Sequence, residues 1–226
     1  MDSTWAVVTG ASSGLGVAFA HRLASEGANI VLAARSEDRL EQVAADLRSR
    51  HGVRTRVSPV DLSSPDGRAG FVEEVSRTPV SHLINNAGYG AMGPVLDGGV
   101  EGLQQQFETN VFSVVGVTRA LFAQLRRKQG LVVNIGSVSG VLVTPFAGAY
   151  CASKAAVHAL SDALRMELAP FGIRVLEVQP GAINTQFAKN ASAQAEHLIS
   201  ENSPWWPMRE GIRARAKASQ DNPTPA

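Results

Sequence analysis

Two side chains that can move a proton lie four residues apart in the segment YCASK, residues 150–154. On an α-helix, Tyr150 and Lys154 would lie one above the other on the same face. An ammonium beside a phenol favours the phenolate and lowers the pKa of the phenol from its ordinary value of about 10. The pair could therefore serve as a tyrosine acid/base. A tyrosine and a lysine that merely share an exposed helix face are common, however, and the pentapeptide alone favours that simpler interpretation.

The elements that would position this pair follow a regular alternation of short apolar runs and amphipathic stretches. Continuous apolar strands separated by helices predict an α/β fold with a parallel sheet covered on both faces. Six strands fit the doubly wound Rossmann-type order 3-2-1-4-5-6. The expected strands, each with the turn that follows it, span residues 5–10, 29–34, 54–60, 81–88, 130–137 and 173–181. The expected helices span residues 14–28, 36–52, 71–76, 100–128 and 149–170, with Ser36 as a cap.

Composition places the chain among ordinary globular proteins. It has 226 residues, of which 44% are hydrophobic, and a net charge of +1, which fits one domain with a large core. The densest basic run, residues 209–217, is interpreted as a solvated helix face, so we expect no nucleic-acid partner. No apolar run approaches the roughly 20 residues of a membrane-spanning helix, and no signal segment is legible. We therefore expect a cytoplasmic protein with no membrane span.

The sequence favours neither a disulfide nor a metal centre. Cys151 is the single cysteine, which excludes an internal disulfide, and it is interpreted as a small buried residue rather than a nucleophile. The histidines show no ligand spacing, so solvated or capped side chains are the default interpretation and no metal is expected. They are His21, His51, His82, His158 and His197.

A glycine-rich loop, TGASSGLG at residues 9–16, connects the first expected strand to the first expected helix. Its glycines allow a tight turn, a close approach of the backbone to a pyrophosphate and close helix–strand packing. The free N–H groups and the dipole of the following helix favour a phosphate at this place. The loop therefore predicts a dinucleotide site formed by Gly10, Ser12, Ser13, Gly14, Leu15 and Gly16.

The end of the second strand indicates which dinucleotide binds. An acid at this place would bind the adenine ribose of NAD, but Ala34 occupies the usual position and Arg35 follows it. An arginine can hold a 2′-phosphate with a fork of donors, so NADP(H) is the expected cofactor. The alternative is that Arg35 is solvated and that Glu37 contacts the ribose.

Taken together, the motifs resemble the single-domain branch of the short-chain dehydrogenase/reductase family. TGASSGLG is followed in order by NNAG at residues 85–88, by Asn110, by Ser137 and by YCASK. Ser137 lies 13 residues before Tyr150, which is the spacing of the family. Each motif alone is moderately specific, whereas their joint order and spacing over about residues 4–186 are highly specific.

The resemblance implies a catalytic role for four residues. Tyr150 would be the general acid in carbonyl reduction and the base in alcohol oxidation, and Lys154 would lower its pKa and bind the nicotinamide ribose. Ser137 would hold the substrate oxygen, with the neighbouring Ser139 as an alternative. Asn110 would bind a water that extends the proton relay to Lys154, or it could merely kink or cap a helix.

The resemblance also implies a groove for NADP(H). Asp61 would meet the adenine ring with Leu62 beside it, and the segment PGAINT at residues 180–185 would lie along the nicotinamide half. The NNAG segment could also be only a turn after a strand. Beyond the glycine loop and Arg35, the implied cofactor-binding residues are Asp61, Leu62, Asn86, Ala87, Gly88, Tyr150, Lys154, Pro180, Gly181, Ile183 and Thr185.

The chain changes character after residue 186. We expect residues 1–186 to form the dinucleotide-binding and catalytic core, and residues 187–226 to form a substrate-lid segment and polar tail of the same domain. Apolar lid residues predict a small-molecule carbonyl or alcohol substrate, namely a hydrophobic ketone or aldehyde or the matching secondary alcohol. Trp205 and Trp206 could equally anchor the lid to the core. The apolar residues of this segment include Phe187, Leu198, Ile199, Trp205, Trp206 and Met208.

One departure from the family concerns assembly. Family members usually continue into a further helix and a seventh strand, which often helps to build a tetramer, and no such strand is legible before Ala226. Either the sequence is truncated or the sheet ends at six strands. A homodimer or homotetramer is expected, and a dimer could form through the helices at residues 100–128 and 149–170.

Three functions follow from these motifs. The first is an NADP-dependent carbonyl reductase, equivalently an alcohol dehydrogenase. The second is a non-catalytic NADP-binding regulator, which would keep the glycine loop and lose the tyrosine and lysine. The third is a sugar-nucleotide epimerase or dehydratase, which usually carries a longer substrate domain than 226 residues leave room for. The presence of Ser137, Tyr150, Lys154 and Asn110 favours the first.

Overall fold

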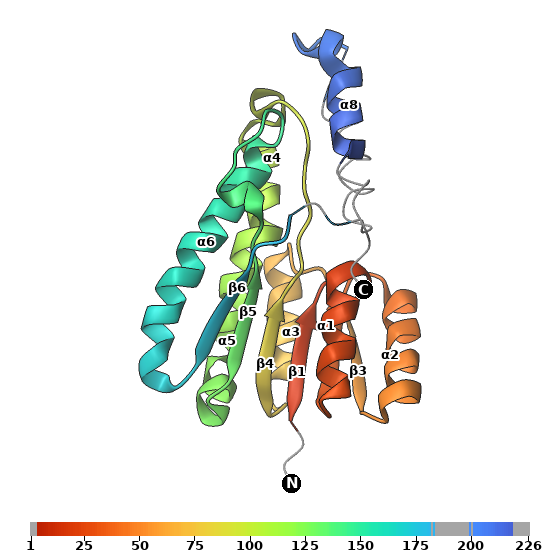
Figure 1. The fold of residues 1–226 in the computed structure, drawn as a ribbon, viewed down its shortest axis with the longest axis vertical. Coiled ribbons are helices and arrows are strands. Elements are labelled where there is room, and N and C mark those ends of the chain that lie inside the picture. The colour runs from red at the N-terminus through yellow and green to blue at the C-terminus, as the bar shows by residue number, and fades with distance from the viewer. Residues whose placement is uncertain (1–3, 182, 184–198, 200, 219–226) are drawn as a thin grey trace.

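The computed structural model describes residues 4–181, 183, 199 and 201–218. Six strands form one parallel sheet in the order β3-β2-β1-β4-β5-β6, which confirms the predicted α/β class and strand order (Figure 1). Apolar residues dominate the central strands because both faces of such a sheet are covered. The strands are β1 (Trp5–Thr9), β2 (Asn29–Ala34), β3 (Thr55–Pro59), β4 (Val80–Asn85), β5 (Leu131–Ile135) and β6 (Arg174–Val178).

Helices cover the two faces of the sheet. Buried side chains of α1 and α2 pack on one face, and those of α3 and α5 pack on the other. The helix α8 lies beyond the carboxyl ends of the strands, apart from the sheet (Figure 1). The α-helices are α1 (Gly14–Ser25), α2 (Glu37–His51), α3 (Pro65–Val75), α4 (Val95–Phe107), α5 (Ser113–Lys128), α6 (Gly148–Leu168) and α8 (Arg209–Ala218).

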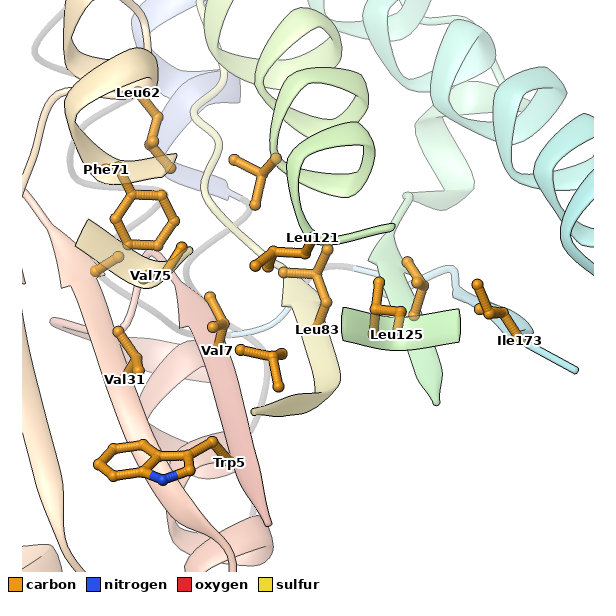
Figure 2. Close-up of a cluster of buried hydrophobic side chains, with 14 of the residues drawn as sticks. Trp5, Val7, Val31, Leu62, Phe71, Val75, Leu83, Leu121, Leu125 and Ile173 are labelled. Atoms are coloured by element: carbon orange, nitrogen blue, oxygen red, sulfur yellow. The ribbon is translucent and has the colours of Figure 1, made fainter. Parts of the chain in front are cut away.

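One buried cluster lies where α3 and α5 meet the centre of the sheet. Phe71 of α3 and Leu121 and Leu125 of α5 are almost fully buried, and they belong to the same cluster as Leu83 of β4 (Figure 2). Burying a side chain of this size stabilises the folded state by about 1.5–3 kcal/mol. This packing holds β4 and α5 in place. β4 ends where the NNAG segment begins, and α5 starts directly after the turn that contains Asn110.

The helix expected over residues 100–128 is present and contains a π-helical turn, η1 (Glu108–Phe112), between α4 and α5. The helix starts earlier than expected, at Val95, and Gly99, with a φ of 58°, departs from helical geometry before the predicted range. The predicted helix is therefore confirmed, and the π-helical turn is a feature that its sequence pattern did not predict. An extra residue in a helical turn is favoured where a side chain finds its partners outside the helix, and Asn110, at the centre of η1, does so.

Another predicted helix start differs, and one predicted cap lacks its hydrogen bond. The helix expected at residues 71–76 begins earlier, at Pro65, where the Ser64 hydroxyl accepts a hydrogen bond from the Gly67 N–H at 2.8 Å. Ser36 does occupy the cap position of α2, but its side chain makes no capping hydrogen bond. Proline in the first turn is compatible with a helix start because its missing N–H would have no helical partner there.

Candidate active site

Three chain segments meet around the end of β5. Ser137 follows β5 and begins the short 3-10 helix η2 (Val138–Gly140), Asn110 lies in η1, and Tyr150 and Lys154 lie one turn apart on α6. The Lys154 Nζ is 5.9 Å from the centre of the Tyr150 ring. The spacing in YCASK therefore corresponds to two side chains on one helix face, as predicted.

Tyr150 is partly buried, and its environment favours the protonated phenol. Burial raises the pKa of Tyr150, a hydrogen bond with Ser137 lowers that pKa, and Cys151 raises it again. The sequence predicted a pKa lowered by Lys154, so the predicted direction was wrong. Removal from water penalises the charged phenolate more than its surroundings stabilise it.

Lys154 is itself buried, with 6% of its surface exposed. Its ammonium donates a hydrogen bond of 2.7 Å to the carbonyl of Ile135, the last residue of β5. Burial lowers the pKa of Lys154 to about 8, and the charge of Glu177 opposes this shift. Lys154 therefore remains mainly protonated at neutral pH, although its charge is held in a desolvated place.

Ser137, rather than Ser139, lies beside Tyr150. The Ser137 side chain is buried and is hydrogen-bonded with Tyr150. The Ser137 Oγ also accepts a hydrogen bond from the Ser139 N–H at 3.1 Å, which caps η2. The backbone N–H of Ser139 thus helps to orient the hydroxyl of Ser137.

Asn110 is buried and holds a neighbouring loop with its side chain. Its Oδ1 accepts a hydrogen bond from the Tyr89 N–H, and its Nδ2 donates to the Tyr89 carbonyl and to the Ser153 hydroxyl, each at 3.0 Å. The side chain is therefore engaged with protein. A water bound by Asn110 would accordingly have to be held mainly by its backbone.

Sequence reasoning missed Gln106, which is fully buried one turn before Asn110. Its Nε2 donates to the Tyr89 carbonyl at 2.7 Å, and its Oε1 accepts from the Ala91 N–H at 2.9 Å. Gln106 and Asn110 together clamp the loop that follows NNAG. The spacing of two amide side chains at i and i+4 was the signal that could have found this pair.

The glycine loop has the shape that a phosphate group needs. Gly10 has a φ of 64°, and a Cβ on Gly10 would lie 2.8 Å from Asn86 Nδ2 and 2.9 Å from Ala87 Cα. A Cβ on Gly16 would overlap the Gly10 carbonyl oxygen. Ser13 makes no side-chain capping bond, and the first turn of α1 contains no acid. The first N–H groups of α1 therefore have no side-chain acceptor, which suits a pyrophosphate.

The NNAG segment is tied firmly to this loop. Asn86 Nδ2 donates to the carbonyls of Thr9 and Gly10 at 3.0 and 3.1 Å. The Thr9 hydroxyl donates to the Ile84 carbonyl and accepts from the N–H groups of Asn86 and Ala87, both at 3.0 Å. A Cβ on Gly88 would lie 3.1 Å from Asn110 Oδ1 and 3.8 Å from Lys154 Nζ. NNAG therefore has a structural role and also connects the glycine loop to Lys154.

We expect Gly16→Ala to lose about 1–3 kcal/mol of the free energy of unfolding, because the new methyl group meets backbone that cannot move aside. Gly70→Ala is the matched control, since Gly70 also lies in a helix and its Cβ would have open space. That change should stabilise the protein slightly. Urea unfolding of both variants measures the two effects, and equal behaviour would contradict the close packing of the loop.

Arg35 and Asp61 lie at the same edge of the sheet. Arg35 is exposed after β2, and its positive charge contributes to the lowered pKa of Asp61. Burial raises the pKa of Tyr89, and the charge of Arg35 opposes that shift. For Asp61 the larger cause of the lowered pKa is the hydrogen bond from the Ser63 hydroxyl, at 2.7 Å. Leu62 points into the core with 5% exposure, so a contact of Leu62 with a cofactor would have to involve its backbone.

The segment after β6 is only partly described. The Pro180 carbonyl accepts a hydrogen bond from the Val138 N–H at 3.1 Å, so this segment lies beside the Ser137 turn. Gly181 and Ile183 follow, whereas Thr185, Phe187 and Leu198 lie outside the described residues.

In the described part of the later segment, the guanidinium of Arg209 lies over the Trp206 ring, 4.4 Å from the ring centre.

Comparison with known proteins identifies the family. The family model described as short chain dehydrogenase matches residues 4–196. The chain belongs to the short-chain dehydrogenase family. Among the residues that the structure describes, no helix is long and apolar enough to cross a membrane. Among the same residues, no group of three or more histidine, cysteine, aspartate or glutamate side chains could hold a metal ion.

Curated relatives extend over most of the chain. A dehydrogenase/reductase SDR family protein 7-like of Anopheles gambiae is 39% identical over 192 residues, which cover 82% of this chain and 61% of that protein. The NADPH-dependent 1-acyldihydroxyacetone phosphate reductase of Schizosaccharomyces pombe is 32% identical over 211 residues, 91% of this chain and 69% of that protein. The chain spans about three fifths of the first of these relatives.

Solved structures of this family superpose closely. A short-chain dehydrogenase from Sphingobium yanoikuyae in complex with NADPH has a TM-score of 0.79 at 29% identity, covering 97% of this chain and 96% of that one. A short chain dehydrogenase/reductase from Burkholderia phymatum in complex with NAD has a TM-score of 0.84 at 29% identity, covering 98% and 80%. Members of one fold thus hold either nicotinamide dinucleotide.

Proposed function

We propose that this protein is an NADP(H)-dependent oxidoreductase that transfers a hydride between the nicotinamide and a carbonyl or secondary alcohol. The observation that carries the proposal is the grouping of Ser137, Tyr150 and Lys154 on one side of NNAG, with the uncapped start of α1 on the other. Membership of the short-chain dehydrogenase family supports it.

The residues present fit a dinucleotide. The glycine loop would hold the pyrophosphate, Arg35 and Asp61 would hold the adenosine half, and the buried Lys154 would hold the nicotinamide ribose. The nicotinamide, when bound, supplies or accepts the hydride. The other proposed contacts are Leu62, Asn86, Ala87, Gly88, Tyr150, Pro180, Gly181, Ile183 and Thr185.

The side chains of this protein would handle the proton. In reduction Tyr150 gives its phenolic proton to the substrate oxygen, while Ser137 donates a hydrogen bond to the negative charge that develops there. Burial raises the pKa of Tyr150, so the phenol keeps its proton at neutral pH and is ready to act as an acid. Oxidation of an alcohol would need the phenolate, so we propose that oxidation requires a higher pH than reduction.

A hydrophobic ketone is the proposed substrate class. The segment between Ser137 and α6 exposes four apolar side chains beside the site, each with 41–75% of its surface exposed: Val138, Val141, Leu142 and Val143. Burying such a surface against an acyl or alkyl group would favour binding. The relatives include a very-long-chain 3-oxoacyl-CoA reductase of Mus musculus, 37% identical over 193 residues, 82% of this chain and 61% of that protein. A ketone on a long acyl chain is therefore the first candidate.

The experiment that tests the function is a cofactor titration followed by turnover. Binding of NADPH and NADH is measured by fluorescence, and NADPH consumption is then measured with ketones and aldehydes of increasing chain length. Tight NADPH binding and turnover that improves with chain length would support the proposal. Tight binding without turnover on any of these carbonyls would favour the non-catalytic regulator.

Arg35→Ala should weaken NADPH binding about 10- to 100-fold and leave NADH binding almost unchanged, because the lost guanidinium would pair only with the 2′-phosphate. Arg22→Ala is a matched control, since it removes the same charge from the last turn of α1. Equal losses for NADPH and NADH would reject Arg35 as the phosphate-binding residue. A selective loss of NADH binding in Glu37→Gln would favour the alternative contact.

We further propose that residues 187–226, of which the structure describes 199 and 201–218, form the substrate-lid segment and tail of the same domain, and that the protein is a homo-oligomer. The Ser203 hydroxyl donates a hydrogen bond of 2.5 Å to Asp97 of α4, which supports the first point. Phe112 and Val115, 45% and 39% exposed near the start of α5, support an association surface on the helices.

A further inference from the structure

A largely buried arginine joins two segments of the candidate site. Arg68 lies on α3, and its side chain is 15% exposed. Its Nη1 donates hydrogen bonds to the carbonyls of Leu62 and Ser63, at 2.9 and 3.1 Å. The same nitrogen lies 2.9 Å from Oε2 of Glu108 in η1, whose side chain is 23% exposed. One guanidinium therefore contacts both the loop after β3 and the π-helical turn.

The contact with Glu108 is a salt bridge rather than a hydrogen bond. Nη1 of Arg68 carries two hydrogens, which the carbonyls of Leu62 and Ser63 account for. Among the described residues, the buried Oε2 of Glu108 accordingly has no hydrogen-bond partner. The guanidinium is thus the group that compensates the burial of this carboxyl oxygen, because a buried charge without a partner is costly.

The stem of Arg68 lies against Gly116 of α5, where a Cβ would be 3.4 Å from Cδ of the arginine. A larger residue at this place would compete with the stem for space. The planar guanidinium has a fixed arrangement of donors, so a stem held in this way also fixes their direction. The packing therefore favours one position of the guanidinium, between Ser63 and Glu108.

The loop that Arg68 holds contains the proposed adenine contact, Asp61. The N–H and the hydroxyl of Ser63 both donate to Oδ1 of Asp61, at 2.9 and 2.7 Å. A Cβ on Gly67 would overlap the Asp61 carbonyl oxygen, so the start of α3 also packs closely on this loop. Arg68 fixes the carbonyl of Ser63, and Ser63 orients the carboxyl of Asp61. The position of Asp61 thus depends on Arg68.

The π-helical turn on the other side of Arg68 contains Asn110. Glu108 is the first residue of η1, and Asn110, two residues later, holds the Tyr89 loop by its side chain. A shift of Glu108 would move the backbone that carries Asn110, since the two residues share one helical turn. Arg68 therefore connects the proposed adenosine end of the dinucleotide site to the proposed catalytic centre.

We propose that Arg68 is a positioning residue that couples the Asp61 loop to the π-helical turn of Asn110 through its salt bridge with Glu108. The coupling itself concerns only the protein, whereas its use in catalysis rests on the proposed function. There it would keep the contact with the adenosine half of NADP(H) aligned with the nicotinamide end. Arg68 acts through Ser63 and Glu108 and would touch neither the cofactor nor the substrate.

Hydrogen exchange of the full-length protein tests the coupling without cofactor or turnover. Glu108→Gln keeps the size of the side chain and removes its charge, and we expect amide exchange at Ser63 and Ser64 to become about 3- to 10-fold faster. Both amides are hydrogen-bonded within the loop. The structure connects them to Glu108 through Arg68.

Removal of the guanidinium should disturb both segments. In Arg68→Met we expect faster exchange at Ser63 and also at Tyr89, whose N–H is bonded to Asn110. Arg68→Lys keeps the positive charge and should restore part of the protection. Glu26→Gln is the matched control, since it breaks an exposed salt bridge at the end of α1 and should leave these amides unchanged.

An unchanged exchange rate at Ser63 and Ser64 in Glu108→Gln would overturn the proposal. Equal acceleration in Glu26→Gln would also overturn it, because the effect would then not depend on the salt bridge of Arg68. If Arg68→Met does not fold, Glu108→Gln and Arg68→Lys decide the outcome, since both retain most of the packing.

Steady-state kinetics separates this inference from the proposed function. Arg68→Met should raise the KM for NADPH and lower kcat with a hydrophobic ketone, each by about 3- to 10-fold, whereas Glu26→Gln should change neither. Faster exchange in a protein that binds no dinucleotide would retain the coupling and reject the oxidoreductase. NADPH-dependent turnover together with unchanged exchange in Glu108→Gln would retain the oxidoreductase and reject the coupling.

Discussion

Tyr150→Phe should lower kcat for carbonyl reduction by about 10³-fold and leave NADPH affinity nearly unchanged. The substitution removes only the phenolic hydroxyl, which would donate the proton, and the ring keeps its place 5.9 Å from Lys154 Nζ. A positioned general acid typically accounts for about 10²- to 10⁴-fold in rate. Steady-state kinetics with a hydrophobic ketone and a fluorescence titration with NADPH measure the two quantities.

The other tyrosine of the chain offers a matched comparison. The chain has two tyrosines, and Gln106 and Asn110 hold Tyr89 through its backbone rather than its hydroxyl. Tyr89→Phe should therefore reduce kcat far less than Tyr150→Phe. If Tyr150→Phe kept near wild-type turnover, the proposed proton donor would be wrong.

Lys154→Met should change how stability depends on pH. The pKa of Lys154 is about 8 in the folded protein and has an ordinary value of 10.5. Between these pH values the unfolded chain binds the proton that the folded chain has lost, so this residue makes the free energy of unfolding rise with pH. The depressed pKa corresponds to about 3 kcal/mol over that interval. The methionine variant lacks this contribution.

Urea unfolding at pH 7, 8, 9 and 10 tests the effect. The stability of the methionine variant relative to the wild type should be greatest below pH 8 and should decrease by about 3 kcal/mol as the pH approaches 10.5. Other titrating groups affect both proteins alike, so the difference isolates Lys154. Parallel stability curves would show that the ammonium is not desolvated. The variant should also lose turnover, since the ribose and the proton relay would lose their ammonium.

Much of the fold followed from local patterns. Short apolar runs between amphipathic stretches predicted the six parallel strands and their order, because strands buried on both faces need continuous apolar residues. Likewise, the four-residue spacing of Tyr150 and Lys154 predicted a shared helix face, and Gly10 and Gly16 predicted close backbone packing. The strand pattern and the Tyr150–Lys154 spacing depend on residues close in sequence, and the glycine loop depends on the connection between the first strand and the first helix.

The tertiary structure decided what depends on distant segments. The π-helical turn at Asn110 requires the Tyr89 loop as its hydrogen-bond partner, which no helical period reveals. The raised pKa of Tyr150 results from burial in the folded chain, whereas sequence reasoning considered only the charge of the neighbouring Lys154. His158 and Glu177 are 19 residues apart and meet only because α6 packs along β6. The sequence by itself therefore determined the fold class and the arrangement of the candidate site, while desolvation and long-range pairing, which require the folded chain, decided the charge state of its groups.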